Sequence, residues 1–298
     1  MPNSQEKCTF AENLVKGTYS NMSTLASKAA KQSVKIVVLA KQVPDTRQVG
    51  PEAMTPEGTV NRSALPAIFN PEDLNALEQA LRLKETYPDA TVTLLTMGPP
   101  RAEEVVREAL YRGADRGFLL TDRAFAGADT LATSYALATA ISSIEPEADL
   151  ILGGRQAIDG DTAQVGPQVA EKLGLNQITY VEEILSCEEG RICAKRRIDG
   201  GFELVESPLP CALTVNGSAA PCRPKNVRRI MRHKHQEIPH LSCAEIGADL
   251  QQCGLSGSPT KVKAIENIVF RAKESKVLSG SDEDIRSLIQ ELKSRKTI

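Results

Sequence analysis

Short apolar runs alternate with amphipathic stretches between residues 34 and 173, and this alternation limits the possible folds more than any other feature of the chain. Residues 34–40 read VKIVVLA, a continuous β-branched run that is typical of a strand buried on both faces. Residues 70–84 then carry leucines at helical spacing. The pattern predicts an α/β fold with a doubly wound, mostly parallel sheet. The expected strands are residues 34–40, 91–96, 116–120 and 149–152, and the expected helices are residues 70–84, 101–112, 130–144 and 163–173.

The pattern changes after residue 174, where turns separate shorter apolar segments. Asp199, Gly200 and Gly201 have the composition of a hairpin turn, so we expect an antiparallel extension of the sheet. The strands expected here are residues 177–185, 191–198, 201–205 and 211–215.

The last part of the chain predicts a C-terminal helical arm. Residues 226–235 are basic and helix-prone, residues 237–258 look irregular, and residues 261–270 form a short amphipathic piece. Residues 282–294 follow Ser281 as a capped helix whose apolar stripe must pack on this domain or on a partner. The stripe consists of Ile285, Leu288, Ile289 and Leu292.

These segments predict three parts. Residues 1–33 are a polar leader, either disordered or an accessory helix, with a transit-type presequence as the alternative. Residues 34–235 form a nucleotide-binding α/β domain, and residues 236–298 a partner-contacting arm.

The composition excludes several classes of function. A net charge of -2 argues against nucleic acid as the main partner, and no apolar run is long enough to span a membrane. The seven cysteines form no C-x-x-C motif and no export signal precedes them, so we expect reduced thiols in the cytoplasm and no metal site. The three histidines, His233, His235 and His240, all lie in one late segment. We therefore identify no catalytic residue and expect a chain that holds a cofactor.

Residues 151–173, ILGGRQAIDGDTAQVGPQVAEKL, carry the strongest signal for a ligand. A strand, a glycine-rich loop and a helix follow one another, and a helix start in this position binds phosphate readily. The loop matches neither the P-loop nor the G-x-G-x-x-G dinucleotide motif. The alternative is an ordinary turn in which Asp161 or Thr162 caps the helix.

Three further strand ends should meet this loop at one edge of the sheet. They carry Lys41, Gly98, and Asp122 with Asp129. Gly98 is also typical of a plain turn, and Asp129 of a plain N-cap. Taken together, the four strand ends favour a nucleotide.

Five segments together resemble the beta subunit of electron-transferring flavoproteins. They keep the family's order and cover residues 34–235. The resemblance implies a heterodimer with an alpha subunit that carries FAD. The matching segments are VKIVVLAKQVPD (34–45), FNPEDLNALEQALRLKE (69–85), TMGPPRAEEVVREALYRGADRG (96–117), GGRQAIDGDTAQVGP (153–167) and KRRIDGGFELVESPLPCALTV (195–215).

Two branches of the family differ in the ligand that the beta subunit holds. The housekeeping branch holds structural AMP. The electron-bifurcating branch holds a second FAD, which takes a hydride from NADH, and its electrons divide between ferredoxin and an acyl-CoA dehydrogenase-type enzyme. GADTLATSYALA (127–138), AIDGDTAQVG (157–166) and GLSGSPTKVK (254–263) resemble the bifurcating branch. We therefore expect that function, with AMP-based electron relay or an ATP-binding regulatory module of the stress-protein kind as alternatives.

The resemblance also implies the residues that bind the cofactor. Asp129, Thr130 and Thr133 would lie by the adenosine and ribitol, Gly160 would leave room for a ligand larger than AMP, and Lys41 or Arg155 would place positive charge near the flavin. Asp161, Thr162, Gln164, Val165 and Gly166 would hold the pyrophosphate. The full expected set is Ala40, Lys41, Asn70, Met97, Gly98, Asp129, Thr130, Thr133, Gly154, Arg155, Gln156, Ala157, Ile158, Gly160, Asp161, Thr162, Ala163, Gln164, Val165 and Gly166.

One segment departs from the family. Housekeeping members present a leucine on a partner-recognition loop after the strand that matches residues 211–215, whereas residues 216–221 here read NGSAAP. The basic run 225–234 would either steer an acidic partner or form a solvated helix face.

Overall fold

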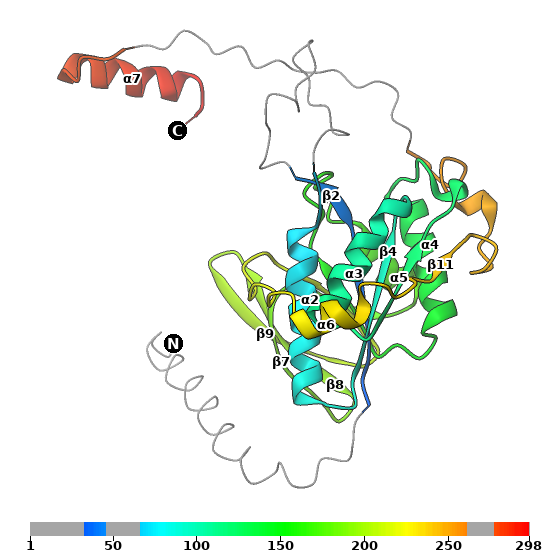
Figure 1. Cartoon of the computed structure of the whole chain (residues 1–298). Coiled ribbons are helices and arrows are strands. Elements are labelled where there is room, and N and C mark those ends of the chain that lie inside the picture. The colour runs from blue at the N-terminus through cyan, green and yellow to red at the C-terminus, as the bar shows by residue number, and fades with distance from the viewer. Residues whose placement is uncertain (1–32, 46–65, 261–276, 298) are drawn as a thin grey trace, which may run out of the picture.

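The computed structural model describes residues 33–45, 66–260 and 277–297 of the chain (Figure 1). Short 3-10 turns, η3 (Pro100–Ala102), η4 (Arg123–Phe125) and η5 (Leu250–Gln252), supplement the regular elements. The strands are β1 (Lys35–Ala40), β2 (Gln42–Pro44), β3 (Ala67–Phe69), β4 (Thr91–Met97), β5 (Arg116–Leu120), β6 (Leu150–Gly154), β7 (Asn176–Glu188), β8 (Arg191–Ile198), β9 (Gly201–Pro208), β10 (Cys211–Val215) and β11 (His240–Leu241). The helices are α2 (Pro71–Thr86), α3 (Glu103–Arg112), α4 (Thr130–Ile144), α5 (Val165–Lys172), α6 (Val227–His233) and α7 (Asp282–Ser294).

A nine-stranded mixed sheet organises the fold, in the order β11-β5-β4-β1-β6-β10-β7-β8-β9. The pairs from β11 to β7 are parallel, and β8 and β9 extend the sheet as an antiparallel hairpin. The two-residue turn at Asp199 and Gly200, with Gly200 at φ 78°, joins these last strands as the sequence predicted. The expected α/β architecture with an antiparallel extension is therefore confirmed.

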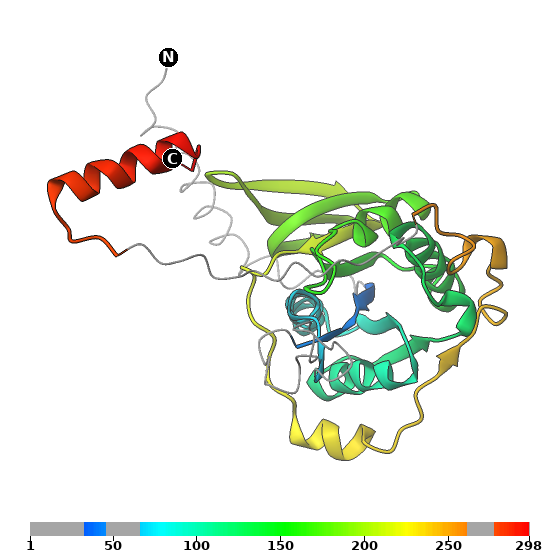
Figure 2. The same cartoon turned by 90° about the horizontal axis from the view of Figure 1, so that it is seen from above.

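Helices cover both faces of the sheet, and β1 lies between two apolar cores (Figures 1 and 2). Ile36 and Val38 pack with residues of α2 and α3, whereas Val37 and Leu39 face α4 and α5. Alternate side chains of a strand point to opposite faces, so a strand covered on both sides must be apolar throughout. Full burial of each such side chain stabilises the fold by about 1.5–3 kcal/mol.

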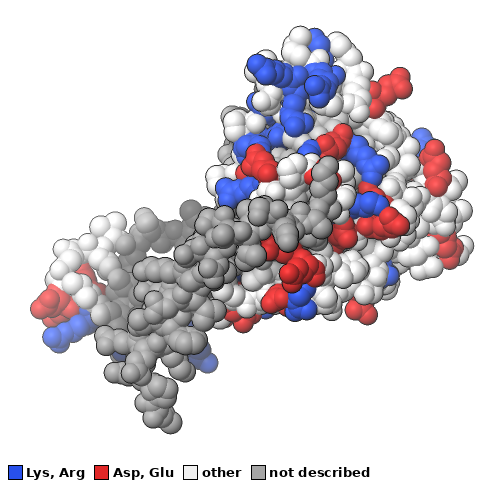
Figure 3. All heavy atoms as spheres, turned by 90° about the horizontal axis from the view of Figure 1, so that it is seen from below, with Lys and Arg blue, Asp and Glu red and all other residues white. Residues whose placement is uncertain are grey.

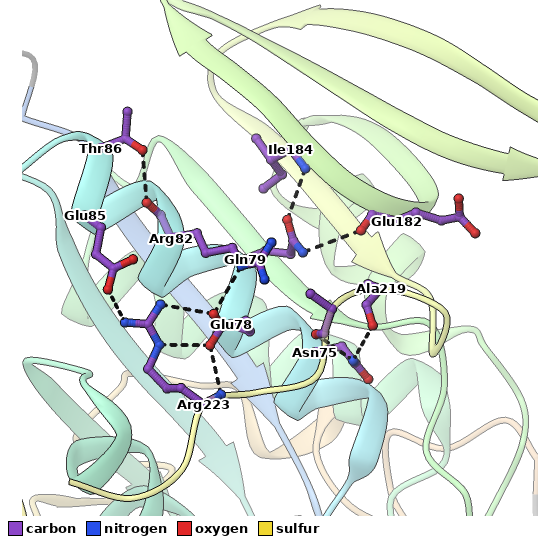
Figure 4. A network of polar contacts seen from close by, with 11 residues as sticks. Asn75, Glu78, Gln79, Arg82, Glu85, Thr86, Glu182, Ile184, Ala219 and Arg223 are labelled. Carbon is purple, nitrogen blue, oxygen red and sulfur yellow. Dashed lines mark hydrogen bonds and ion pairs between the residues drawn. The ribbon is translucent and has the colours of Figure 1, made fainter.

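Helix α2 buries polar side chains as well as its leucine stripe, and each of these polar groups has a partner (Figure 4). The amide of Asn75 donates to the carbonyl of Ala219 at 3.0 Å, and Glu78 accepts the backbone N–H of Arg223 at 3.0 Å. The Gln79 side chain accepts from the N–H of Ile184 at 3.1 Å. A buried polar group without a partner would cost about 1–3 kcal/mol. The contacts of Asn75 and Glu78 therefore fix the path of residues 219–223 over α2, and the contact of Gln79 joins α2 to β7.

The structure differs from the sequence prediction at several boundaries. The helix expected at residues 163–173 begins only at Val165, and the helix expected from Arg101 begins as a 3-10 turn. Strands β2, β3 and β11 were not expected; β11 adds an edge beside β5. They are two or three residues long, too short for a periodic pattern.

The terminal helix has the predicted bounds, and the hydroxyl of Ser281 caps it by accepting from Asp284 N–H. None of its residues is buried; Ile285 and Ile289 are 46% and 41% exposed. The described residues therefore leave its apolar stripe open. The leader at residues 1–32 and the segment 261–270 lie outside the described residues.

We expect Gly154→Ala to destabilise the fold, because a Cβ there would lie 2.7 Å from the carbonyl carbon of Glu72 in α2. Backbone cannot move aside as a flexible side chain does, so the free energy of unfolding should fall by about 1–3 kcal/mol. Chemical denaturation measures the change. Gly201→Ala is the matched control, because nothing lies within 4 Å of its Cβ position; equal stability of the two variants would contradict the prediction.

Candidate functional site

A cavity of about 460 Å³ lies at the carboxyl ends of β1, β4 and β6. Strand β1 pairs with β4 on one side and with β6 on the other, so the chain reverses its direction of winding between β1 and β6. Open α/β sheets bind ligands at such a switch point. The starts of α4 and α5 form two further walls.

Most residues expected from the sequence line this cavity. Asn70, Gly98 and Ile158 do not. The cavity is also lined by Leu39, Asp73, Phe125 and Leu137, which were not expected, and by Gly127, Ala128 and Gly153, which belong to the loops expected at its rim. The expected residues that line it are Ala40, Lys41, Met97, Asp129, Thr130, Thr133, Gly154, Arg155, Gln156, Ala157, Gly160, Asp161, Thr162, Ala163, Gln164, Val165 and Gly166.

The start of α5 is open toward the cavity. Gln164 occupies the N-cap position without a side-chain hydrogen bond to the helix, and Pro167 has no N–H to satisfy. The alternative in which Asp161 or Thr162 caps this helix is wrong, because α5 begins four residues after Asp161 and three after Thr162. First-turn N–H groups without a capping side chain are available to an anion.

The loop before α5 has an unusual backbone conformation. Asp161 and Ala163 have φ angles of 49° and 53°, which residues with a Cβ rarely adopt, and Gln164 returns to the right-handed region. Left-handed and right-handed residues in succession point consecutive N–H groups into one concavity, which binds anions. Such strain collects at functional sites, so the loop supports an anion site.

The start of α4, in contrast, is already capped. Asp129 accepts the N–H groups of Leu131 and Ala132, both at 3.0 Å, so the N-cap role that the sequence offered as an alternative is confirmed. Partial burial raises the pKa of Asp129, but hydrogen bonds from Thr260 and Ala132 outweigh it and lower the pKa. The Thr130 hydroxyl donates to the Gln164 side chain at 2.9 Å and so joins the two helix starts. An anion therefore fits at α5 and not at α4.

Both cations that the sequence placed near the ligand are paired. Lys41 Nζ lies 2.8 Å from a carboxylate oxygen of Asp159, and Arg155 Nη2 lies 3.0 Å from Glu72. The hydrogen bond to Glu72 raises the pKa of Arg155, whose guanidinium also lies 5.6 Å from the ring centre of Tyr180. The carboxylates of Asp159 and Glu72 compensate these two charges, so the net positive charge at the cavity is smaller than the sequence indicated.

Side chains at the start of α2 form hydrogen bonds with the backbone segments that border the cavity. The carboxylate of Asp73 accepts the N–H of Lys41 at 2.8 Å and that of Gly154 at 2.9 Å. Asn70 donates to the Gln156 carbonyl at 2.9 Å and accepts the Ile158 N–H at 3.2 Å. Asn70 and Ile158 thus shape the loop without lining the cavity. Asp73 was missed because an acidic residue in a first helical turn is usually solvated.

Asp73 is buried, and burial raises its pKa to about 7 although Asn70 and the two N–H groups act in the opposite direction. In the unfolded chain the pKa is about 4. Between about pH 4 and pH 7, Asp73 is therefore protonated in the folded protein and ionised in the unfolded chain. The stabilising contribution of this group is complete below about pH 4 and is lost as the pH rises through about 7.

We expect the free energy of unfolding of the wild type to decrease from pH 4 to pH 8 relative to that of Asp73→Asn, which has no proton to lose at this position. Urea denaturation at a series of pH values measures both. Asp199→Asn, in the turn between β8 and β9, is the comparison for an exposed aspartate. If the wild type and Asp73→Asn show parallel pH profiles, the raised pKa is contradicted.

A second hollow of about 620 Å³ lies between α2 and α3, against the β2–β3 pair and residues 217–222. It is larger than the cavity at the strand ends. It lies beside α2 and α3 and not at the switch point between β1 and β6, so we assign the ligand site to the smaller cavity.

Within the described residues, no group of three or more histidine, cysteine or acidic side chains is placed to hold a metal ion. The described cysteines are free thiols: Cys187, Cys193, Cys211, Cys222, Cys243 and Cys253. No helix among the described residues is long and apolar enough to cross a membrane.

The fold and the cavity together define an α/β protein with a cavity at the switch point of its sheet. Residues 57–245 match the family described as the electron transfer flavoprotein domain. The chain belongs to this family, as a member of its beta-subunit group, and the resemblance found in the sequence is confirmed.

Curated relatives match over most of their length. Protein FixA of Bradyrhizobium diazoefficiens is 44% identical over 259 residues, which is 85% of this chain and 89% of that protein. The caffeyl-CoA reductase-Etf complex subunit CarD of Acetobacterium woodii is 46% identical, over 77% of this chain and 86% of that protein. The electron transfer flavoprotein subunit beta of Megasphaera elsdenii is 46% identical, over 78% and 87%.

Proposed function

We propose that the chain is the beta subunit of an electron-bifurcating electron transfer flavoprotein and that its cavity binds FAD. Membership of the family supports electron transfer together with an alpha subunit. The open start of α5 beside the cavity is the observation that carries the choice of a nucleotide ligand.

The residues of the cavity fit a dinucleotide. The N–H groups of Val165 and Gly166 and the concavity formed at Ala163 offer donors for a pyrophosphate. Nothing lies within 4 Å of the Cβ position of Gly160, so this rim leaves room for a ligand that extends beyond a mononucleotide. Apolar side chains of Leu39, Met97 and Leu137 also line the cavity.

FAD bound here would supply the chemistry of hydride acceptance from NADH and of electron passage. The protein's own part is positional. Asp73 and Asn70 fix the loop that contains Gln156, and the Arg155–Glu72 pair places a compensated cation at the rim. No side chain is needed as an acid, base or nucleophile.

Names of relatives support an acyl-CoA-type acceptor. CarD is a subunit of a caffeyl-CoA reductase complex, which by its name reduces an acyl-CoA compound. We propose an acyl-CoA dehydrogenase-type enzyme and ferredoxin as the two electron acceptors of this chain and its alpha subunit.

Structural AMP is the alternative ligand. The volume of about 460 Å³ lies in the lower half of the usual range for ligand cavities, about 300–1,000 Å³, which favours a mononucleotide. An ATP-binding regulatory module of the stress-protein kind is not retained, because the chain belongs to the flavoprotein family.

Co-expression with the alpha subunit should yield a heterodimer that releases two FAD molecules on denaturation, because each subunit would hold one. Chromatography of the extract identifies and counts the nucleotides. Gly166→Val should deplete only the beta-subunit ligand, since a Cβ at Gly166 would lie 2.7 Å from Thr214 and push α5 away from β10. Gly174→Asn is the control, because that position is open and Asn tolerates its φ of 66°. One FAD and one AMP per heterodimer would contradict the FAD proposal.

Helix α6 presents a surface suited to an electron-transfer partner. Val227 and Met231 lie one turn apart and are 73% and 62% exposed. Basic side chains gather around this helix, as Figure 3 shows from below. The nearby Arg112 and Lys225 form ion pairs with Glu108. Arg228 and Arg232 form no ion pair with a described residue. An apolar pair among unpaired cations fits an acidic partner that also buries apolar area.

We expect Val227→Ser with Met231→Ser to weaken binding of the dehydrogenase-type partner through a faster dissociation rate. Arg228→Gln with Arg232→Gln should slow association and reduce its salt dependence, because surface charges act on the encounter. Surface plasmon resonance at several ionic strengths separates these effects. Arg123→Gln, an exposed arginine on η4, is the control. Unchanged kinetics in both double variants would place partner binding elsewhere.

A further inference from the structure

Residues 243–260, here called the strap, lie across the segment Asp122–Asp129 beside the start of α4 (Figures 1 and 2). The N–H of Cys243 donates to the carboxylate of Asp122 at 3.0 Å. Gly254 has a φ of 53°, and a Cβ there would lie 2.3 Å from the carbonyl oxygen of Ala124. Only glycine allows the strap to approach this backbone so closely.

The covered segment is also one wall of the nucleotide cavity. Phe125, Gly127, Ala128 and Asp129 line the cavity from this side. The side chain of Leu255 rests on Gly127, where a Cβ would lie 2.7 Å from its Cγ atom. The strap therefore lies on the outside of a wall whose inside faces the ligand.

Two hydroxyl groups of the strap fasten it to Asp129. The N–H of Asp129 donates to Ser258 Oγ at 2.8 Å, and that hydroxyl donates to the Gly254 carbonyl at 2.6 Å. Thr260 donates to Asp129 Oδ2 from its N–H at 3.1 Å and from its hydroxyl at 2.6 Å. The other oxygen, Oδ1, caps α4.

We propose that Ser258 and Thr260 are positioning residues for the nucleotide site: they hold Asp129 and the start of α4 in the conformation that retains the ligand. This inference rests on the proposed function, because it requires a nucleotide in the cavity. Neither residue lines the cavity, so each acts through Asp129.

The physical reason lies in the use of both carboxylate oxygens. A hydrogen bond from a hydroxyl to a carboxylate is stronger than one between neutral groups. Without it, Oδ2 of Asp129 keeps only the N–H of Thr260, and the backbone from Gly127 to Thr130 is held less firmly from outside. Thr130 and Thr133 on the first turn of α4 then line the cavity less rigidly, and the bound ligand dissociates faster.

The test uses the full-length chain with its alpha subunit and compares Thr260→Val, Ser258→Ala and the double variant with wild type. After dilution into nucleotide-free buffer, flavin fluorescence and chromatography of the released nucleotide give the dissociation rate from the beta subunit. We expect release from the double variant to be about fivefold to thirtyfold faster. Thr260→Ser keeps the hydroxyl and should restore the wild-type rate.

Ser256→Ala, at an exposed position of the same strap, is the matched control and should release nucleotide at the wild-type rate. Wild-type release from the double variant overturns the inference and leaves the nucleotide site intact. Faster release from Ser256→Ala as well also overturns it, because the effect would then belong to the strap in general. A wild-type beta subunit that carries no nucleotide overturns the proposed function, and this inference with it.

Discussion

The carboxylate of Asp73 receives one backbone N–H from the end of β1 and one from the end of β6. Parallel strands diverge at a switch point, and their last N–H groups would otherwise face a ligand cavity without partners. A single side chain from the first turn of α2 satisfies both. The cavity thus owes its floor to a buried acid, which explains why α2 packs so closely on Gly154 that no Cβ fits there.

The two helix starts at the cavity are built differently, and the difference decides where an anion fits. Asp129 fills the start of α4 with its own carboxylate, whereas the start of α5 has no capping side chain. A negative side chain and a phosphate cannot share one set of N–H groups. The capped helix α4 is therefore suited to forming a wall of the cavity, and the uncapped helix α5 to binding an anion.

Much of the fold was predictable because strands such as β1 are apolar from Ile36 to Ala40 and helices such as residues 130–144 have a clear N-cap. The loop 153–166 and Asp129 were also found from sequence, because a glycine-rich loop between a strand and a helix is typical of a phosphate site and the family resemblance implied the same residues. Asp73, Glu72 and Ser258 were not found. Their roles depend on backbone groups far away in sequence, such as the pairing of Asp73 with Gly154 across 81 positions, and no local pattern records such a contact.

Helix α2 carries the cavity loop on its first turn and residues 216–223 further along, through Asn75 and Glu78 (Figure 4). Those residues lead directly into α6. Helix α2 therefore connects the cavity proposed to bind FAD with the segment that leads to α6, the surface proposed to bind a partner. Electron tunnelling slows steeply with distance, so under the proposed function a change in the length of α2 would alter the rate of electron transfer.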